Sequence, residues 1–181
     1  APQSAGRGVL TILNNQIQAA RDVTKTNSYR LETFQAADFG FLGYADSDEE
    51  VVFYRRPDRA HTVDSEFDVE GLDQLPRVDI ALAYAGADGL VIKALAQAGV
   101  DGLVAAGLGS GGSPPPFMAA LKEVSEAGLP VVIATQTCSG RVMQTRRFTE
   151  DGYIVADNLT PKKARILLML ALEKTKDKAE I

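Results

Sequence analysis

Lys25 is the residue whose type and setting most suggest chemistry. It stands among hydroxyls and an aspartate in the polar segment 21–27, which follows an apolar run and reads as a loop or an edge strand. A lysine held by neighbouring groups can assist a nucleophile, because burial and nearby charges shift its pKa readily. A solvated lysine on the surface is the competing interpretation, and the spacing alone favours it.

Two loops at the predicted ends of strands are the next candidates. The segment 85–88, Ala-Gly-Ala-Asp, follows one apolar run, and the glycine-rich segment 107–112 follows another. In parallel sheets the loops that leave the carboxyl ends of strands gather the binding residues. The glycine segment lacks the Lys-Ser/Thr ending of a P-loop and the full dinucleotide fingerprint. A tight turn before a proline-started helix is therefore the main interpretation, and a nucleotide-binding module stays as an alternative.

His61 and Cys138 do not form a recognisable reactive pair. Each is the single residue of its type, which excludes an internal disulfide and a Cys/His zinc site. His61 is predicted to be a structural residue of a linker, since no Ser or Cys stands near it in a nucleophile motif. Cys138 is predicted to be a small apolar residue at a strand end.

Composition limits the kinds of partner. The chain has 181 residues, of which 45% are hydrophobic, enough for one core or for a small domain plus part of another. The net charge of -5 is mixed along the chain, with no basic stripe for nucleic acid and no polybasic patch for a membrane. No apolar run approaches the roughly 18 residues of a membrane span. Small molecules and other protein chains are the expected partners.

The first half of the chain predicts strands. Residues 6–14 have the length and branching of a buried strand, which needs neighbours on both sides and cover on both faces. The next hundred residues supply these only in part, so we interpret the chain as a piece of a longer protein. Residues 40–45 and 51–56 flank an acidic turn and predict a hairpin that Pro57 ends.

From residue 78 onward the pattern alternates between strand and helix. Strands are predicted at 78–84, 102–106 and 130–135, with helices at 89–98, from 113 and from 160. Connections of this length imply a parallel sheet covered on both faces. The predicted fold class is α/β, with the tail of an N-terminal α/β domain (1–56), a linker (57–76) and a C-terminal parallel-sheet α/β domain (77–181).

Each predicted helix has one apolar face and an end signal. Gly99 should stop the first helix, and prolines lie in the first turns of the other two. The predicted inward residues are Leu90, Ile92 or Val91, Leu95 and Ala98 in the first, Phe117, Leu121 and Val124 in the second, and Ala164, Leu167, Leu168 and Leu172 in the third.

The segment 21–27, Arg-Asp-Val-Thr-Lys-Thr-Asn, resembles the hallmark segment of bacterial L-asparaginases and glutaminase-asparaginases. Other strings agree in order over nearly the whole chain. They lie at 7–10, 40–43, 56–57, 61–62, 67–69, 75–80, 109–111 and 159–165. The resemblance implies the C-terminal part of an amidohydrolase that converts L-asparagine, or L-glutamine, to the acid and ammonia.

The resemblance also implies a role for Lys25. In the family a first domain carries two threonines, in a Thr-Gly-Gly-Thr and a Gly-Thr-Asp-Thr motif, and neither motif occurs in this sequence. The family's lysine pairs with the aspartate of the second motif to activate a threonine, and the match gives Lys25 this catalytic role. Such a relay needs no metal or cofactor. The chain alone is expected to be inactive without the missing N-terminal segment.

The family's site is completed across an intimate homodimer, and two dimers form a homotetramer. The segment 84–88 resembles the contributed loop, although the best-known members carry asparagine where Gly86 stands. Gly86 and Asp88 are therefore the expected substrate-binding residues, with Asp88 or the backbone contacting the substrate amino group.

Two features of the family pattern leave choices open. A second contributed residue, a glutamate, has no clean match around Arg146, Arg147 and Glu150, so the choice between asparagine and glutamine stays undecided. Residues 61–67 resemble the periplasmic class more than the cytoplasmic one. The alternative function is a non-catalytic fragment that acts as a dimerisation or assembly partner.

Overall fold

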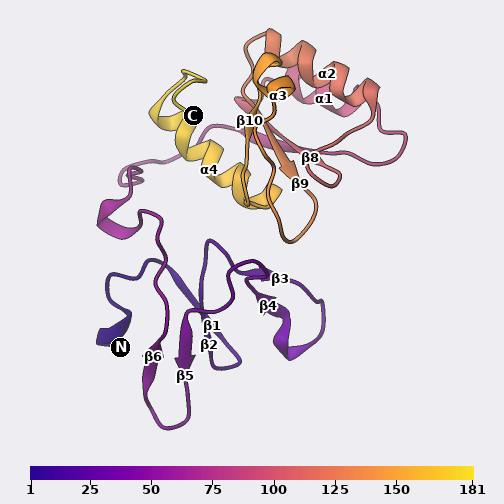
Figure 1. Cartoon of the computed structure of the whole chain (residues 1–181). Coiled ribbons are helices and arrows are strands. Elements are labelled where there is room, and N and C mark those ends of the chain that lie inside the picture. The colour runs from indigo at the N-terminus through magenta and orange to yellow at the C-terminus, as the bar shows by residue number, and fades with distance from the viewer. The chain divides into compact units, whose positions relative to one another are not determined.

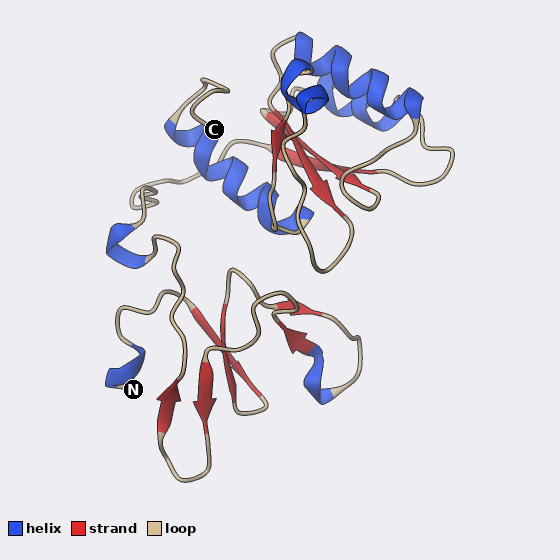
Figure 2. Ribbon diagram, in the orientation of Figure 1, coloured by secondary structure: helices blue, strands red, loops and turns tan.

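The computed structural model describes residues 1–181, which form two compact units, Ala1–Asp68 (unit 1) and Val69–Ile181 (unit 2) (Figure 1). Unit 1 consists of strands and short 3-10 turns, whereas unit 2 alternates strands and helices (Figure 2). The predicted α/β class with a parallel C-terminal sheet is confirmed. None of the helices combines the length and the apolar character that crossing a membrane requires.

Unit 1 is built on an antiparallel sheet of four strands in the order β1-β2-β5-β6. These are β1 (Leu10–Leu13), β2 (Gln16–Ala19), β5 (Gly43–Ala45) and β6 (Val51–Phe53). β1 and β2 are joined by Asn14 and Asn15, both with positive φ, which is the two-residue hairpin turn that asparagine favours. The predicted hairpin after residue 40 is confirmed, with Gly43 opposite Phe53.

The strand predicted over residues 6–14 is shorter than predicted, Leu10–Leu13, and is not buried within this chain. β1 lies at the edge of the sheet, with β2 as its one strand neighbour. Val9 is 77% exposed and Ile12 is 57% exposed. An antiparallel edge strand needs cover on one face at most, so apolar content alone did not determine its burial. The core of unit 1 instead lies around Ile17 and Leu42, which are almost fully buried.

The remaining elements of unit 1 are short. A separate two-stranded ribbon pairs β3 (Thr24–Lys25) with β4 (Phe34–Gln35). The 3-10 turns are η1 (Pro2–Ser4), η2 (Leu31–Thr33) and η3 (Thr62–Asp64).

Unit 2 contains a parallel sheet in the order β10-β9-β8-β7. Its strands are β7 (Val78–Leu82), β8 (Gly102–Gly107), β9 (Val131–Thr135) and β10 (Ile154–Val155). The helices are α1 (Leu90–Gln97), α2 (Pro115–Glu126), α3 (Arg146–Glu150) and α4 (Pro161–Lys174). The three predicted strands and three predicted helices are present, whereas β10 and α3 were not predicted.

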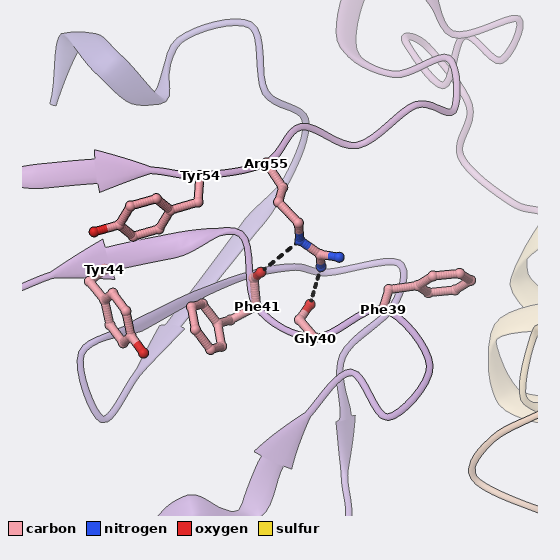
Figure 3. A pocket seen from close by; sticks show the side chains of 6 residues that line it. All are labelled: Phe39, Gly40, Phe41, Tyr44, Tyr54 and Arg55. Carbon is pink, nitrogen blue, oxygen red and sulfur yellow. Dashed lines mark hydrogen bonds between the residues drawn. The ribbon is translucent and has the colours of Figure 1, made fainter.

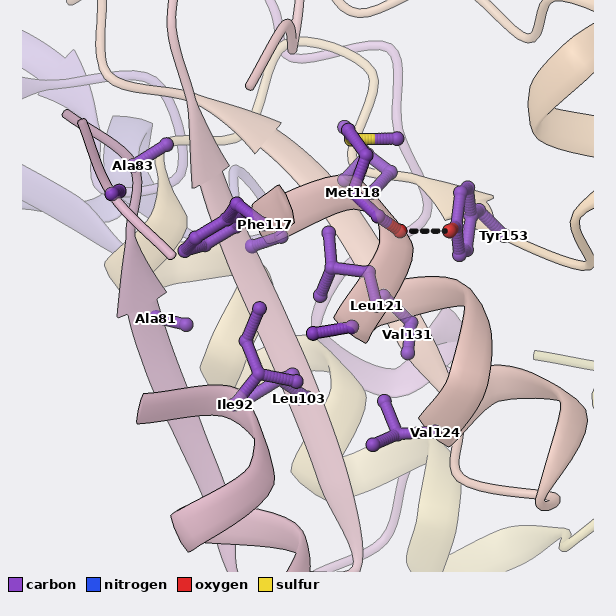
Figure 4. Close-up of a cluster of buried hydrophobic side chains, with 14 of the residues drawn as sticks. Ala81, Ala83, Ile92, Leu103, Phe117, Met118, Leu121, Val124, Val131 and Tyr153 are labelled. Carbon is purple, nitrogen blue, oxygen red and sulfur yellow. Dashed lines mark hydrogen bonds between the residues drawn. The ribbon is translucent and has the colours of Figure 1, made fainter. Parts of the chain in front are cut away.

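The sheet of unit 2 is buried on both faces. Leu103 of β8 belongs to a core that includes Phe117 of α2 (Figure 4), and the next residue, Val104, packs in a second core with Leu168 of α4. All four side chains are at most 2% exposed. This two-sided burial explains why the strands read as continuous apolar runs rather than as alternating ones.

The predicted helix faces are only partly correct. Phe117, Leu121 and Val124 of α2 are buried as predicted. Leu90, however, is 74% exposed and Leu167 is 42% exposed. Leu90 is the first residue of α1, and the inward position falls to Ile92. In α4 the stripe of residues 164, 168 and 172 takes the core side, which leaves Leu167 on the flank.

Candidate active site

Lys25 is held in the β3–β4 ribbon. It lies directly opposite Phe34, and its ammonium nitrogen is 5.5 Å from the centre of the Phe34 ring. Lys25 itself is exposed. A cation over an aromatic face is attracted by the ring, so Phe34 gives the flexible lysine stem a preferred direction.

The polar residues after Lys25 close the ribbon. The backbone nitrogen and the hydroxyl of Thr26 both donate to the carbonyl of Thr33, at 2.7 and 3.0 Å. The Asn27 side-chain oxygen accepts from the nitrogens of Tyr29 and Arg30, at 2.9 and 3.0 Å. The polar groups of Thr26 and Asn27 therefore shape the turn that follows Lys25.

Gly86 and Asp88 lie together in the loop that leaves the carboxyl end of β7. Gly86 is exposed with φ of 81°, and the Ala87 nitrogen donates to the carbonyl of Tyr84 at 2.9 Å. Asp88 is also exposed, and its Oδ1 accepts from the nitrogen of Leu90 at 3.0 Å. Asp88 thus satisfies one of the free N–H groups at the start of α1, a role that sequence analysis did not foresee.

Gln136 fixes the start of this loop, and sequence analysis missed it. It follows β9, and its side-chain nitrogen donates to the carbonyls of Ala83 and Ala106, at 2.6 and 2.7 Å. Ala83 directly follows β7, and Ala106 lies near the end of β8. The Gln136 side chain therefore connects the ends of β7, β8 and β9 by hydrogen bonds. The signal that could have identified it is the polar string 135–137 directly after a buried strand.

The glycine-rich segment 107–112 is a tight turn. The nitrogens of Gly111 and Gly112 both donate to the carbonyl of Leu108, at 3.1 and 2.8 Å. A Cβ on Gly107 would lie 2.5 Å from the carbonyl carbon of Gly111, so the close approach requires glycine. Thr135 donates its hydroxyl to the carbonyl of Gly109. Because two of the loop's N–H groups are used within the turn, it is a poor phosphate cradle, which disfavours the nucleotide-binding alternative.

His61 and Cys138 belong to different units. The His61 ring lies 3.3 Å from the position of a Cβ on Gly8, and its Nδ1 is 3.2 Å from the Thr62 hydroxyl. Cys138 is an exposed free thiol in the loop after β9. Neither arrangement is that of an activated nucleophile.

Unit 1 also contains an aromatic pocket of about 400 Å³ (Figure 3). Its lining residues are Phe39, Gly40, Phe41, Tyr44, Tyr54 and Arg55. The Arg55 guanidinium donates to the carbonyls of Phe41 and Gly40, at 3.2 and 2.9 Å. The one cationic group of the pocket is therefore engaged with the backbone, and no predicted site residue lines it.

Comparison with known proteins identifies relatives along the whole chain. The family model described as the Glutaminase/Asparaginase C-terminal domain matches residues 77–181, and that described as Asparaginase, N-terminal matches residues 1–59. L-asparaginase 2 of Bacillus subtilis (strain 168) is 38% identical over 181 residues, which are 100% of this chain and 48% of that protein. A glutaminase-asparaginase of Pseudomonas fluorescens biotype A is 37% identical over 97% of this chain and 49% of that protein.

A solved structure agrees with the sequence matches. The crystal structure of a probable cytoplasmic L-asparaginase from Campylobacter jejuni has a TM-score of 0.95 and 39% identity, and the match covers 99% of this chain and 57% of that one. The chain spans about half the length of the relatives that it matches. Since the C-terminal family model alone covers more than half of its residues, this chain belongs to the asparaginase family.

Proposed function

We propose that this chain forms the lysine-bearing and C-terminal part of an amidohydrolase that converts L-asparagine to L-aspartate and ammonia. The observation that supports this most is the end-to-end similarity to L-asparaginase 2, at 38% identity over all 181 residues. The threonine nucleophile would lie in a segment outside this sequence, which contains neither threonine motif of the family. Relatives named glutaminase-asparaginases make L-glutamine the second substrate to test.

Lys25 would act as the relay for the nucleophile. A threonine hydroxyl must lose its proton as it attacks the amide carbon, and the ammonia leaving group must gain one. A lysine in its neutral amine form can accept that proton, with the paired aspartate stabilising the ammonium that forms, and can return it to the leaving nitrogen. Water then hydrolyses the threonine ester to the acid. The position of Lys25 on a hydrogen-bonded ribbon, over the Phe34 ring, supports such a role because a relay group must be held in one direction.

Gly86 and Asp88 would bind the substrate of a neighbouring subunit. β7 is an edge strand, and the residues beside the loop are apolar yet exposed, with Leu82 54%, Tyr84 58% and Leu90 74% exposed. Such a surface suits a self-complementary contact between two copies, which supports a homodimer or a homotetramer of dimers. The Asp88 carboxylate would then attract the α-ammonium group of asparagine. The resemblance of residues 61–67 to the periplasmic class makes the periplasm the proposed compartment.

The test is reconstitution of activity. The complementing segment is a polypeptide that carries the family's Thr-Gly-Gly-Thr and Gly-Thr-Asp-Thr motifs, mixed or fused with this chain. We expect ammonia from L-asparagine only when both are present. Ammonia release by the rigorously purified chain alone would contradict a nucleophile outside it. A stable complex that releases no ammonia would favour the alternative, a non-catalytic assembly partner.

A further inference from the structure

Gln18 is a buried amide whose place in unit 1 calls for a role. It lies in β2 between two buried apolar residues, Ile17 and Ala19, and is itself 2% exposed. Its Nε2 donates to the carbonyl of Phe34 at 2.5 Å, whereas its Oε1 is buried without a partner. An amide buried with one end unsatisfied destabilises the fold relative to an apolar side chain. The bond to Phe34 is the one gain that the structure offers for it.

That bond reaches the strand that faces Lys25. Phe34 is the residue directly opposite Lys25, and its ring lies below the ammonium. The ribbon of β3 and β4 has two residues in each strand and pairs with no third strand. An isolated two-stranded ribbon is marginally stable in water. We infer that Gln18 is a positioning residue, which anchors the ribbon to the four-stranded sheet and thereby sets the direction of Lys25.

This inference rests on the proposed function of Lys25. A small displacement of the Lys25 side chain would slow proton transfer, because proton transfer depends on the geometry of the groups. Substrate binding by the loop of Gly86 and Asp88 should not change. Without the Gln18 anchor, we expect kcat of the assembled enzyme to fall by about tenfold and KM for L-asparagine to stay unchanged. Because a loss of folded enzyme would also lower the apparent kcat without changing KM, turnover is calculated per folded molecule, and hydrogen exchange within the ribbon reports on the positioning itself.

The test compares Gln18→Met with Gln35→Met. Methionine keeps the volume of glutamine without the amide. Gln35 lies in the same ribbon, but its Nε2 donates to the carbonyl of Glu32 at an exposed position. Amide hydrogen exchange is measured first on the 181-residue chain, at the Thr26 nitrogen, which donates to Thr33 within the ribbon. We expect exchange about tenfold faster in Gln18→Met and close to wild type in Gln35→Met.

Four results would overturn the inference. If exchange at the Thr26 nitrogen is equally fast in both variants, Gln18 does not anchor the ribbon to the four-stranded sheet. An unchanged kcat in Gln18→Met, together with a loss of turnover in Lys25→Met, would reject the positioning role and leave the proposed function intact. Wild-type turnover in Lys25→Met would reject both. Should Gln18→Met fail to fold, Gln18→Leu replaces it, and loss of the cooperative urea transition in both would make Gln18 a core residue only.

Discussion

Replacing Gln136 by leucine should loosen the loop that carries Gly86 and Asp88. The change removes two hydrogen bonds, to the carbonyls of Ala83 and Ala106. A hydrogen bond contributes about 0.5–1.5 kcal/mol net, and Ala106 keeps the backbone bond from the Ala83 nitrogen at 3.0 Å. We therefore expect the free energy of unfolding of unit 2 to fall by about 1–2 kcal/mol.

The assay is urea unfolding of the 181-residue chain together with hydrogen exchange at the Ala87 nitrogen, which donates to Tyr84 inside the loop. Gln144→Leu is the matched control, because Gln144 also donates two bonds from one amide, to the Thr149 hydroxyl and the Tyr153 carbonyl. Both variants should lose similar stability, but only Gln136→Leu should speed exchange at Ala87, by about tenfold. Equal exchange rates at Ala87 in the two variants would refute the role of Gln136 in holding this loop.

Two further predictions concern the stability of unit 2. Burial, and then the charge of Asp151, raise the pKa of Tyr153 to about 12, so an unfolded tyrosine ionises near pH 10 while the folded one stays neutral. The free energy of unfolding should therefore fall from about pH 10 upward, by up to about 1.4 kcal/mol per pH unit. Urea unfolding at about pH 9 and 11 should show a shallower decline in Tyr153→Phe than in the wild type. An identical decline in the two proteins would contradict the raised pKa of Tyr153. Gly107→Ala should cost about 3 kcal/mol or more by clashing with the Gly111 backbone, whereas Gly112→Ala, where a Cβ has ordinary contacts, should cost far less in the same assay; equal midpoints would contradict the tight turn.

The α/β part of the fold could be predicted because its strands and helices carry strong local signals. β8 is apolar at every position since both faces are covered, and α2 begins at proline with an inward stripe ending at Val124. β10 and α3 were not predicted, because two and five residues are too few to show the hydrophobic periodicity of a strand or a helix. The exposure of β1 could not be predicted, because an apolar edge strand and an apolar central strand have the same composition.

The candidate site could be predicted only in part. Spacing alone favoured a surface lysine, and the family resemblance, rather than any local pattern, singled out Lys25. The partners of Gln18 and Gln136 could not be predicted from the sequence, because they lie 16 and up to 53 residues away. Such hydrogen bonds depend on tertiary contacts that bring distant segments together, and the only local signal is the polar string 135–137 that follows a buried strand.

Turnover of Lys25→Met in the assembled enzyme tests the central claim most directly. Methionine keeps much of the apolar stem of lysine but removes the ammonium that lies 5.5 Å from the centre of the Phe34 ring, so the ribbon should stay folded. Lys162→Met, at an exposed position of α4, is the control for the loss of one lysine. Ammonia release from L-asparagine should fall by orders of magnitude in Lys25→Met and stay at the wild-type rate in Lys162→Met. Wild-type ammonia release by Lys25→Met would contradict the relay and return Lys25 to the solvated surface.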